Sequence, residues 1–289
     1  MPELPEVETI RLQLKPKIIG KTIKDIKILE KKQFIGKKED VVGKKIVSIE
    51  RFGKILVFKL VNPLTRKLAN YKFLNIHLKL TGEILYTNNL KNSVFKDVIP
   101  FTKTTKMPSK TTRVVFAFSD GSGLFFNDMR KFGWIKITDQ PEKPQGIDVL
   151  SNEFTVEYLT IITQQTSKPI KLLLLDQEKI AGIGNIYANE ALFLAKIHPL
   201  KKSKSLSKLE VAKLYQTIKK VIEQGIKYGG STSADEAYIK PNGSRGSYQT
   251  HFKVYQRENE PCLICKTPIK RIKQGGRSSF FCPMCQQPT

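Results

Sequence analysis

The four cysteines of the chain lie close to its C-terminus and form two Cys-x-x-Cys pairs. Their spacing is C-x2-C-x16-C-x2-C, and the residues are Cys262, Cys265, Cys282 and Cys285. Each pair can point two thiolates at one tetrahedral ion, and the stretch between the pairs can form a β-hairpin. Two disulfides are the alternative, but a cytoplasmic compartment argues against them. We expect one structural Zn2+ with no open coordination position, and no catalytic metal or organic cofactor.

The N-terminus carries a proline and a glutamate at the start of a predicted helix. The small side chain of Pro2 makes Met1 a substrate for methionine aminopeptidase, and removal of Met1 would expose a secondary amine. The positive end of a helix favours the neutral, nucleophilic form of such an amine. Its attack on a sugar C1′ would give a cationic iminium, which is an electron sink for a later elimination. Glu3 and Glu6 are candidate proton-transfer groups beside it, although Pro-Glu also begins many helices without any catalytic role.

The chain has 289 residues, enough for about two domains. Its 50 Lys and Arg residues exceed its 26 Asp and Glu residues, which gives a formal charge of +24. Such a surface attracts polyanions, nucleic acid above all, although a lysine-biased proteome would raise the charge in the same way. No apolar run approaches the ~18 residues of a membrane span, and the acidic N-terminus lacks the features of a signal peptide. We expect a cytoplasmic protein that makes no membrane contact.

The predicted secondary structure that must position these groups changes from mainly strands to mainly helices near residue 140. A helix is predicted from Leu4, with Val7, Ile10 and Leu14 on its apolar face and Pro16 ending it. Strands are then expected at Lys45–Glu50, Ile55–Val61, Tyr71–Leu80, Arg113–Phe118 and Leu124–Asn127. Helices are expected at Phe154–Gln165, Ile170–Leu175, Asn185–Lys196 and from the capping box Ser207-Lys-Leu-Glu210 to Gly229-Gly230.

The change of pattern predicts an α+β protein with two main domains. Residues 1–137 would form a β-sandwich or barrel with one helix, and 138–151 a linker. Residues 152–250 would form a helical domain that ends in a mobile loop over 231–250, and 251–289 the cysteine module.

Several motifs together resemble the formamidopyrimidine-DNA glycosylase family. The N-terminus Met1-Pro-Glu-Leu-Pro-Glu-Val-Glu-Thr matches that of the family nearly letter for letter. Further matches follow in chain order: Arg51-Phe-Gly-Lys-Ile-Leu56, His77-Leu-Lys-Leu-Thr-Gly82, Asn127-Asp-Met-Arg-Lys-Phe-Gly133, Ala181-Gly-Ile-Gly-Asn-Ile-Tyr-Ala-Asn-Glu190, Ile197-His-Pro199, Val254-Tyr255 and the four-cysteine module. The resemblance therefore covers essentially the whole chain.

The resemblance implies an N-terminal β-sandwich with a catalytic helix, a helix–two-turns–helix domain and a zinc-finger hairpin. It implies a base-excision repair enzyme that removes oxidised purines, chiefly 8-oxoguanine and formamidopyrimidines, and then nicks the abasic site by β,δ-elimination. By motif match Pro2 is the nucleophile, Glu3 the acid/base, and Lys54 the group that holds the lesion phosphate and assists the lyase step. The implied partner is double-stranded DNA that contains oxidised bases or abasic sites. The resemblance also implies a monomer that acts in a bacterial-type cytoplasm and lies at the nucleoid when it is bound to DNA.

The resemblance also implies phosphate contacts. One candidate is Asn185, which follows Gly182-Ile-Gly184 at a predicted helix start, where backbone N–H groups can bind an anion. The other is Arg277 in the predicted hairpin, whose guanidinium can donate paired hydrogen bonds to a phosphate. Gly-x-Gly by itself is usually a tight turn, and a lone surface arginine is usually only solvated. His77 either contacts phosphate or is a buried structural histidine. The acids of the matched motifs, Glu6 and Glu190, are candidates for a supporting role.

The space left by an extruded base is filled in the family by Met, Arg and Phe, and the matching residues here are Leu80, Arg130 and Phe132. Leu80 departs from the pattern but is apolar and of similar volume. Phe132 could equally be a core aromatic. Gln256 stands where the family usually has Gly, and the loop 231–250, which carries damaged-base recognition in relatives, matches only partly.

Three alternatives remain open at this point. An endonuclease VIII-like glycosylase would act on oxidised pyrimidines, although Leu4 and Val7-Glu-Thr match the purine branch better. A damage-binding protein without catalysis would not need Pro2, Glu3 and Lys54. An RNA- or ribosome-associated zinc-ribbon protein would not need the Pro-Glu terminus.

Overall fold

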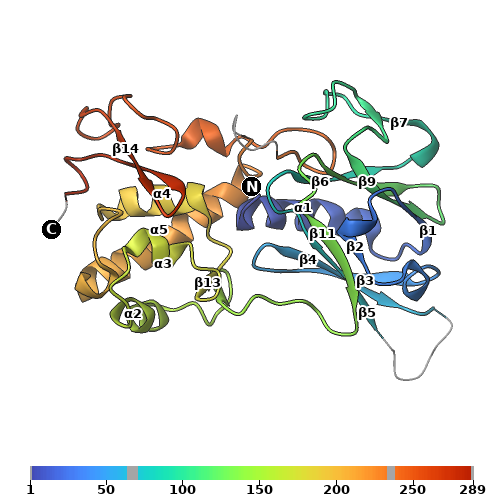
Figure 1. Cartoon of the computed structure of the whole chain (residues 1–289), viewed down its shortest axis with the longest axis horizontal. Coiled ribbons are helices and arrows are strands. Elements are labelled where there is room, and N and C mark those ends of the chain that lie inside the picture. The colour runs from blue at the N-terminus through green and yellow to red at the C-terminus, as the bar shows by residue number, and fades with distance from the viewer. Residues whose placement is uncertain (1, 64–70, 233–237, 288–289) are drawn as a thin grey trace. The chain divides into compact units, whose positions relative to one another are not determined.

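The computed structural model describes residues 2–63, 71–232 and 238–287, and the chain divides into two compact units (Figure 1). The first, which we call the sandwich unit, comprises Met1–Lys143 and Tyr228–Gln249. The second, which we call the helical unit, comprises Pro144–Lys227 and Thr250–Thr289. The α+β class with a β-sandwich followed by a helical domain is confirmed.

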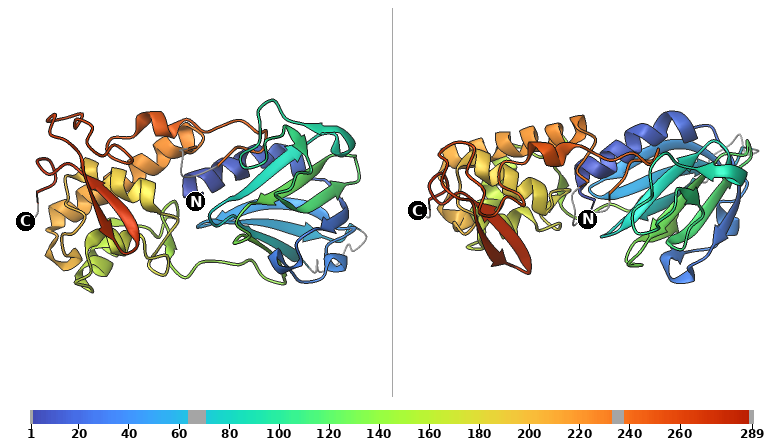
Figure 2. Two further views of the ribbon diagram at one scale, coloured as in Figure 1. Left: turned by 45° about the horizontal axis from the view of Figure 1, so that its top comes forward. Right: turned by 90° about the horizontal axis from the view of Figure 1, so that it is seen from above.

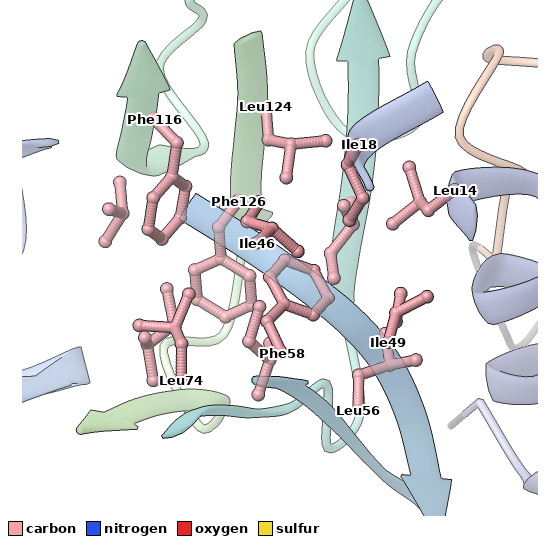
Figure 3. Close-up of a cluster of buried hydrophobic side chains, with 14 of the residues drawn as sticks. Leu14, Ile18, Ile46, Ile49, Leu56, Phe58, Leu74, Phe116, Leu124 and Phe126 are labelled. Carbon is pink, nitrogen blue, oxygen red and sulfur yellow. The ribbon is translucent and has the colours of Figure 1, made fainter. Parts of the chain in front are cut away.

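The sandwich unit contains two sheets. One has the strand order β1 (Ile23–Ile28), β9 (Thr112–Phe118), β10 (Gly123–Asp128) and β6 (Gly82–Thr87). The other has the order β2 (Phe34–Ile35), β11 (Trp134–Thr138), β5 (Lys72–His77), β4 (Ile55–Val61) and β3 (Lys45–Phe52). Alternate side chains of these strands, including Phe58, Leu74 and Phe126, meet in the core (Figure 3). A short pair, β7 (Ser93–Val94) and β8 (Lys106–Met107), lies on the chain between β6 and β9.

Helix α1 (Leu4–Ile18) packs its apolar face into the same core through the fully buried Val7, Ile10, Leu14 and Ile18. The prediction that Pro16 ends this helix is wrong, because the helix continues to Ile18. Pro16 removes one backbone hydrogen bond, but burial of Leu14 and Ile18 on both sides of it keeps the last turn helical.

The helical unit contains α2 (Val156–Gln164), α3 (Ile170–Leu174), α4 (Asn185–Ala195) and α5 (Lys208–Lys227). Ser207 and Glu210 form the predicted capping box: the Ser207 N–H donates to the Glu210 carboxylate at 2.9 Å, and the Glu210 N–H donates to the Ser207 hydroxyl at 3.2 Å. The predicted linker is partly ordered, since β12 (Ile147–Asp148) pairs in parallel with β13 (Ile180–Ala181).

Near the C-terminus, β14 (Lys270–Gln274) and β15 (Arg277–Phe281) form the predicted hairpin, and β15 lies against α4 (Figure 2). The described part of the chain also has five short 3-10 turns, at Lys31–Gln33, Lys38–Asp40, Leu90–Asn92, Ser203–Ser205 and Tyr248–His251.

Two further predictions differ from the structure. The strand predicted over Tyr71–Leu80 ends at His77, because the chain turns at 78–81 to cross from the β5 sheet to the β6 sheet. The segment 228–249, expected in the helical domain, packs in the sandwich unit. There the Ser231 N–H donates to Glu6 at 2.8 Å, and Gly230, with φ +78°, comes so close that a Cβ would lie 2.9 Å from the Glu6 side chain. Residues 233–237 of the predicted loop lie outside the described residues.

Candidate active site and DNA-contact residues

The N-terminus of α1 holds Pro2 and Glu3 in buried positions. Glu3 is the N-cap of the helix and forms a capping box with Glu6, whose carboxylate accepts the Glu3 N–H at 2.8 Å. The other Glu6 oxygen accepts the Ser231 N–H at 2.8 Å. Glu6 therefore fixes the backbone beside Pro2, and the positive end of the helix lies next to this residue.

Lys54 lies in the two-residue turn between β3 and β4 and is 6% exposed. An ion pair connects this turn to α1, since the Arg51 guanidinium contacts Glu8 at 3.0 Å and also donates to the Gly53 carbonyl at 2.8 Å. Burial works to raise the pKa of Glu8, but the hydrogen bond from Arg11 and the charge of Arg51 outweigh it and hold that pKa below its usual value. Glu8 thereby sets the position of the Lys54 turn relative to helix α1.

His77 ends β5 and is paired with Ile55, the residue after Lys54. Burial, with the charges of Lys79 and Lys54, lowers the pKa of His77 to about 3, so the ring is neutral at pH 7. Its Nδ1 accepts the Lys79 N–H at 3.0 Å, which leaves the ring proton on Nε2 as a hydrogen-bond donor. As a whole residue His77 is half-buried. A neutral donor of this kind has the chemistry to contact a phosphate oxygen.

The residues predicted to fill the space of an extruded base lie on two turns of the sandwich unit. Leu80 is on the turn 78–81, and Arg130 and Phe132 are on the turn 129–133. Phe132 is 53% exposed, so it is not a core aromatic. The exposed Arg130 guanidinium lies over its ring, 5.0 Å from the ring centre.

In the helical unit, Asn185 is the first residue of α4 and follows Gly182, whose φ is +105° and whose N–H donates to Gln177. Glu190, on the same helix, is buried and accepts N–H groups from Lys253, Val254 and Tyr255 at 2.8–3.0 Å. Burial raises the pKa of Glu190, although these three hydrogen bonds act in the opposite direction.

Glu190 thus holds the segment that leads to the cysteine module. Gln256 follows this segment with φ +57°, a left-handed conformation that glycine adopts more easily. That backbone explains why glycine is usual at this position in the family.

The four cysteines are free thiols, and their sulfur atoms lie within 4.8 Å of one another. The separations include 3.4 Å for Cys265–Cys282 and 3.9 Å for Cys262–Cys285. A tetrahedral zinc with bonds of about 2.3 Å needs sulfur atoms about 3.8 Å apart, so the four residues fit one structural Zn2+. The Cys262 and Cys282 sulfurs also accept the N–H groups of Ile264 and Cys285, as thiolate ligands do.

Arg277 is exposed at the tip of the hairpin, beside the turn formed by Gly275 and Gly276. Polar contacts hold strand β15 of this hairpin to the helices. The fully buried Lys171 of α3 donates to the Ser278 carbonyl and the Ser279 hydroxyl, both at 2.7 Å. Asn189 of α4 accepts the Phe280 N–H at 2.8 Å.

The predicted residues therefore form two groups. Pro2, Glu3, Lys54, His77 and the turns of Leu80, Arg130 and Phe132 belong to the sandwich unit, and Asn185, Glu190, Arg277 and the cysteines belong to the helical unit. Sequence reasoning missed the Glu8–Arg51 pair and Asp128. The i,i+3 spacing of Glu8 and Arg11 indicates a pair within the helix, and the matched motif around Asn127–Gly133 contains Asp128, but neither pattern indicates the distant partners Arg51 and Thr81.

A DNA glycosylase of base-excision repair is the class of enzyme that this fold and site define, and comparison with known proteins assigns the family. Residues 1–135 match the formamidopyrimidine-DNA glycosylase N-terminal domain, 145–237 its H2TH domain, and 259–288 the zinc finger found in FPG and IleRS. The formamidopyrimidine-DNA glycosylase of Pelotomaculum thermopropionicum is 38% identical, with 99% of each chain covered.

Solved structures agree with this assignment. The MutM (Fpg) protein of Thermus thermophilus superposes with a TM-score of 0.83 at 31% identity, over 100% of both chains. A Lactococcus lactis Fpg mutant in complex with Fapy-dG-containing DNA superposes with a TM-score of 0.81 at 30% identity, over 99% of this chain and 100% of that one. The chain belongs to the formamidopyrimidine-DNA glycosylase family, whose members are bifunctional glycosylase/AP lyases.

No helix in the described part of the chain is long and apolar enough to cross a membrane.

Proposed function

We propose that this enzyme excises oxidised purines from duplex DNA through a covalent intermediate on Pro2. The observation that carries the proposal is the buried Pro2–Glu3 pair at the N-terminus of α1, with the backbone of Glu3 fixed by Glu6. After removal of Met1, the Pro2 nitrogen is a secondary amine, and the helix end favours its neutral form. A nucleophile needs this rigidity, because small displacements of the attacking atom cost large factors in rate.

The reaction begins when the Pro2 nitrogen attacks C1′ and the bond to the damaged base breaks. Glu3 transfers protons at the deoxyribose, and loss of the amine proton with ring opening gives a cationic iminium. The iminium acidifies the C2′ protons, so the 3′ phosphate leaves by β-elimination and the 5′ phosphate by δ-elimination. Lys54 holds the lesion phosphate by charge. Hydrolysis of the remaining iminium returns the Pro2 amine.

The proposed DNA contacts divide by chemistry. Arg277, Asn185 and His77 donate hydrogen bonds to phosphates, which position the duplex without reading its sequence. Leu80, Arg130 and Phe132 fill the space that the extruded base leaves. The solved complexes of the Lactococcus lactis relative contain Fapy-dG DNA and abasic-site DNA, which supports the same partner here. We propose further that the enzyme binds as a monomer and acts in the cytoplasm at the nucleoid.

Borohydride trapping on a duplex with one 8-oxoguanine tests the proposed chemistry. We expect Glu3→Gln to lower base excision by about 10²–10⁴-fold with lesion binding retained, as expected for loss of an acid/base group. Pro2→Gly keeps a primary amine and should weaken trapping without abolishing it. Glu39→Gln, an exposed carboxylate of the same unit, is the control. Full excision by Glu3→Gln, or mass spectrometry showing Met1 retained in active enzyme, would exclude these roles.

Oxidised pyrimidines are the second candidate substrate class. The Lactococcus lactis relative has also been solved with oxidised-pyrimidine DNA. A competition between duplexes with 8-oxoguanine and an oxidised pyrimidine decides which is preferred, and preferential excision of the pyrimidine would reverse our assignment.

A further inference from the structure

The turns 78–81 and 129–133 run side by side at one end of the sandwich. The first takes the chain from β5 to β6, and the second takes it from β10 to β11. The strands that they join are themselves paired, His77 with Trp134 in one sheet and Asp128 with Gly82 in the other. Each turn therefore leaves one sheet and enters the other beside its partner turn.

One buried carboxylate contacts both turns. Asp128 is fully buried, and its Oδ1 accepts the Thr81 hydroxyl at 2.5 Å and the Arg130 N–H at 3.2 Å. Its Oδ2 accepts the Gly133 N–H at 2.7 Å and the Gln33 amide at 2.8 Å. The Thr81 hydroxyl in turn accepts the Arg130 N–H at 3.0 Å.

These contacts connect the residue after Leu80 directly to the backbone of Arg130. Hydrogen bonds to a carboxylate are among the strongest in proteins, and one at a buried carboxylate is costly to leave unmade. A displacement of either turn would break the bond between Thr81 and Asp128 or the bond between Thr81 and Arg130. The two turns are thus held in one fixed relation.

We propose that Thr81 and Asp128 are positioning residues that make Leu80, Arg130 and Phe132 enter DNA as one unit. The proposal rests on the insertion role proposed above for these three side chains. An extruded base leaves a single space in the stack, and side chains on independent turns would lose more conformational freedom on filling it. Coupling the turns in advance reduces that loss.

A double-mutant cycle measures the coupling. We define discrimination as the affinity for a duplex with a tetrahydrofuran abasic analogue divided by the affinity for the undamaged duplex. This ratio is measured for Leu80→Ala, Phe132→Ala and the double variant. The same three changes are then made together with Thr81→Val, which is isosteric but removes the hydroxyl. Thr81→Ser keeps the hydroxyl and should rescue the ratio. Thr87→Val is the matched control, because the Thr87 hydroxyl bonds to nearby Asn89 and not to either turn.

With Thr81 present, we expect the fold-loss of discrimination in the Leu80→Ala/Phe132→Ala variant to be smaller than the product of the fold-losses in the two single variants. With Thr81→Val, discrimination should fall about fivefold and the remaining losses should multiply, since one hydrogen-bonded connection is gone. If the single variants lose discrimination but Thr81→Val changes neither the ratio nor the cycle, the coupling is wrong and the insertion role stands. If Leu80→Ala and Phe132→Ala leave the ratio unchanged, the insertion role is wrong and the coupling with it.

Discussion

Helix α1 and the hairpin β14–β15 are held in the fold by different physical means. The helix places five fully buried side chains in the apolar core, at Leu4, Val7, Ile10, Leu14 and Ile18. The hairpin has few such side chains and depends on four cysteines and on buried polar contacts to Lys171 and Asn189. A long element can be held by apolar burial, whereas a short terminal module needs crosslinks.

Removal of the metal should have the largest effect and should separate the two regions. Structural zinc contributes roughly 10–16 kcal/mol in zinc-finger peptides, so Cys282→Ser or chelation should unfold the hairpin module and abolish duplex binding. Trp134, the one tryptophan of the chain, lies in β11 and reports on the sandwich unit, whose thermal transition should not change. Met284→Ala, an exposed change in the same module, is the control. Normal lesion binding by demonstrably zinc-free protein would show that the hairpin does not depend on the metal.

Ile10→Ala tests the apolar side of the comparison. Truncation of a fully buried isoleucine costs about 2–5 kcal/mol, so the melting transition followed by Trp134 fluorescence should fall by roughly 5–15 °C. Leu12→Ala lies on the same helix at a position that is 45% exposed and should have little effect. Zinc content should stay normal in both variants. Equal destabilisation by the two changes would show that core burial does not hold this helix.

Arg277→Ala should have a smaller effect, confined to DNA affinity. The plot of log affinity against log salt should lose about one unit of slope, and lesion and undamaged duplex should weaken alike. Lys273→Ala removes an exposed charge from the same hairpin and is the control. Arg130→Ala should instead weaken lesion binding selectively. Reversed signatures for Arg277 and Arg130 would mean that the two roles are exchanged.

Glu8→Gln should have the smallest effect, and one that depends on pH. The pKa of Glu8 in the folded protein lies below its ordinary value of 4.5, so the carboxylate stabilises the fold above that pH. This contribution disappears as the pH falls through the folded-state pKa. We expect urea unfolding at pH 7 to show a loss of less than about 1 kcal/mol, and the difference from wild type to narrow as the pH is lowered below 4.5. A difference that widened on acidification would contradict this interpretation of the ion pair.

Local patterns predicted the elements, and contacts distant in sequence explain the failures. Ile55–Val61 is a strand with the predicted bounds, and the capping box at Ser207 forms as expected. The predicted strand Tyr71–Leu80 is too long because Leu78 and Leu80 continue the apolar alternation, while the crossing between sheets ends the strand at His77.

The candidate site shows the same limit. Pro2, Glu3, Lys54 and the cysteines were identifiable from motifs and family resemblance, because each motif is continuous in sequence. The partners that hold them were not. Glu8 reaches Arg51 on β3, and Asp128 reaches Thr81 and Gln33, residues that only the folded chain brings together.

The contact between Glu6 and Ser231 has a consequence for protein synthesis. Ribosomes deliver the N-terminus first, and domains generally fold as they emerge. The carboxylate that fixes the backbone beside Pro2 obtains its second partner only after residue 231 of 289 has been made, about four-fifths of the chain. The nascent sandwich can collapse early, but the N-terminal end of α1 is completed late, when the whole of α5 has already been translated.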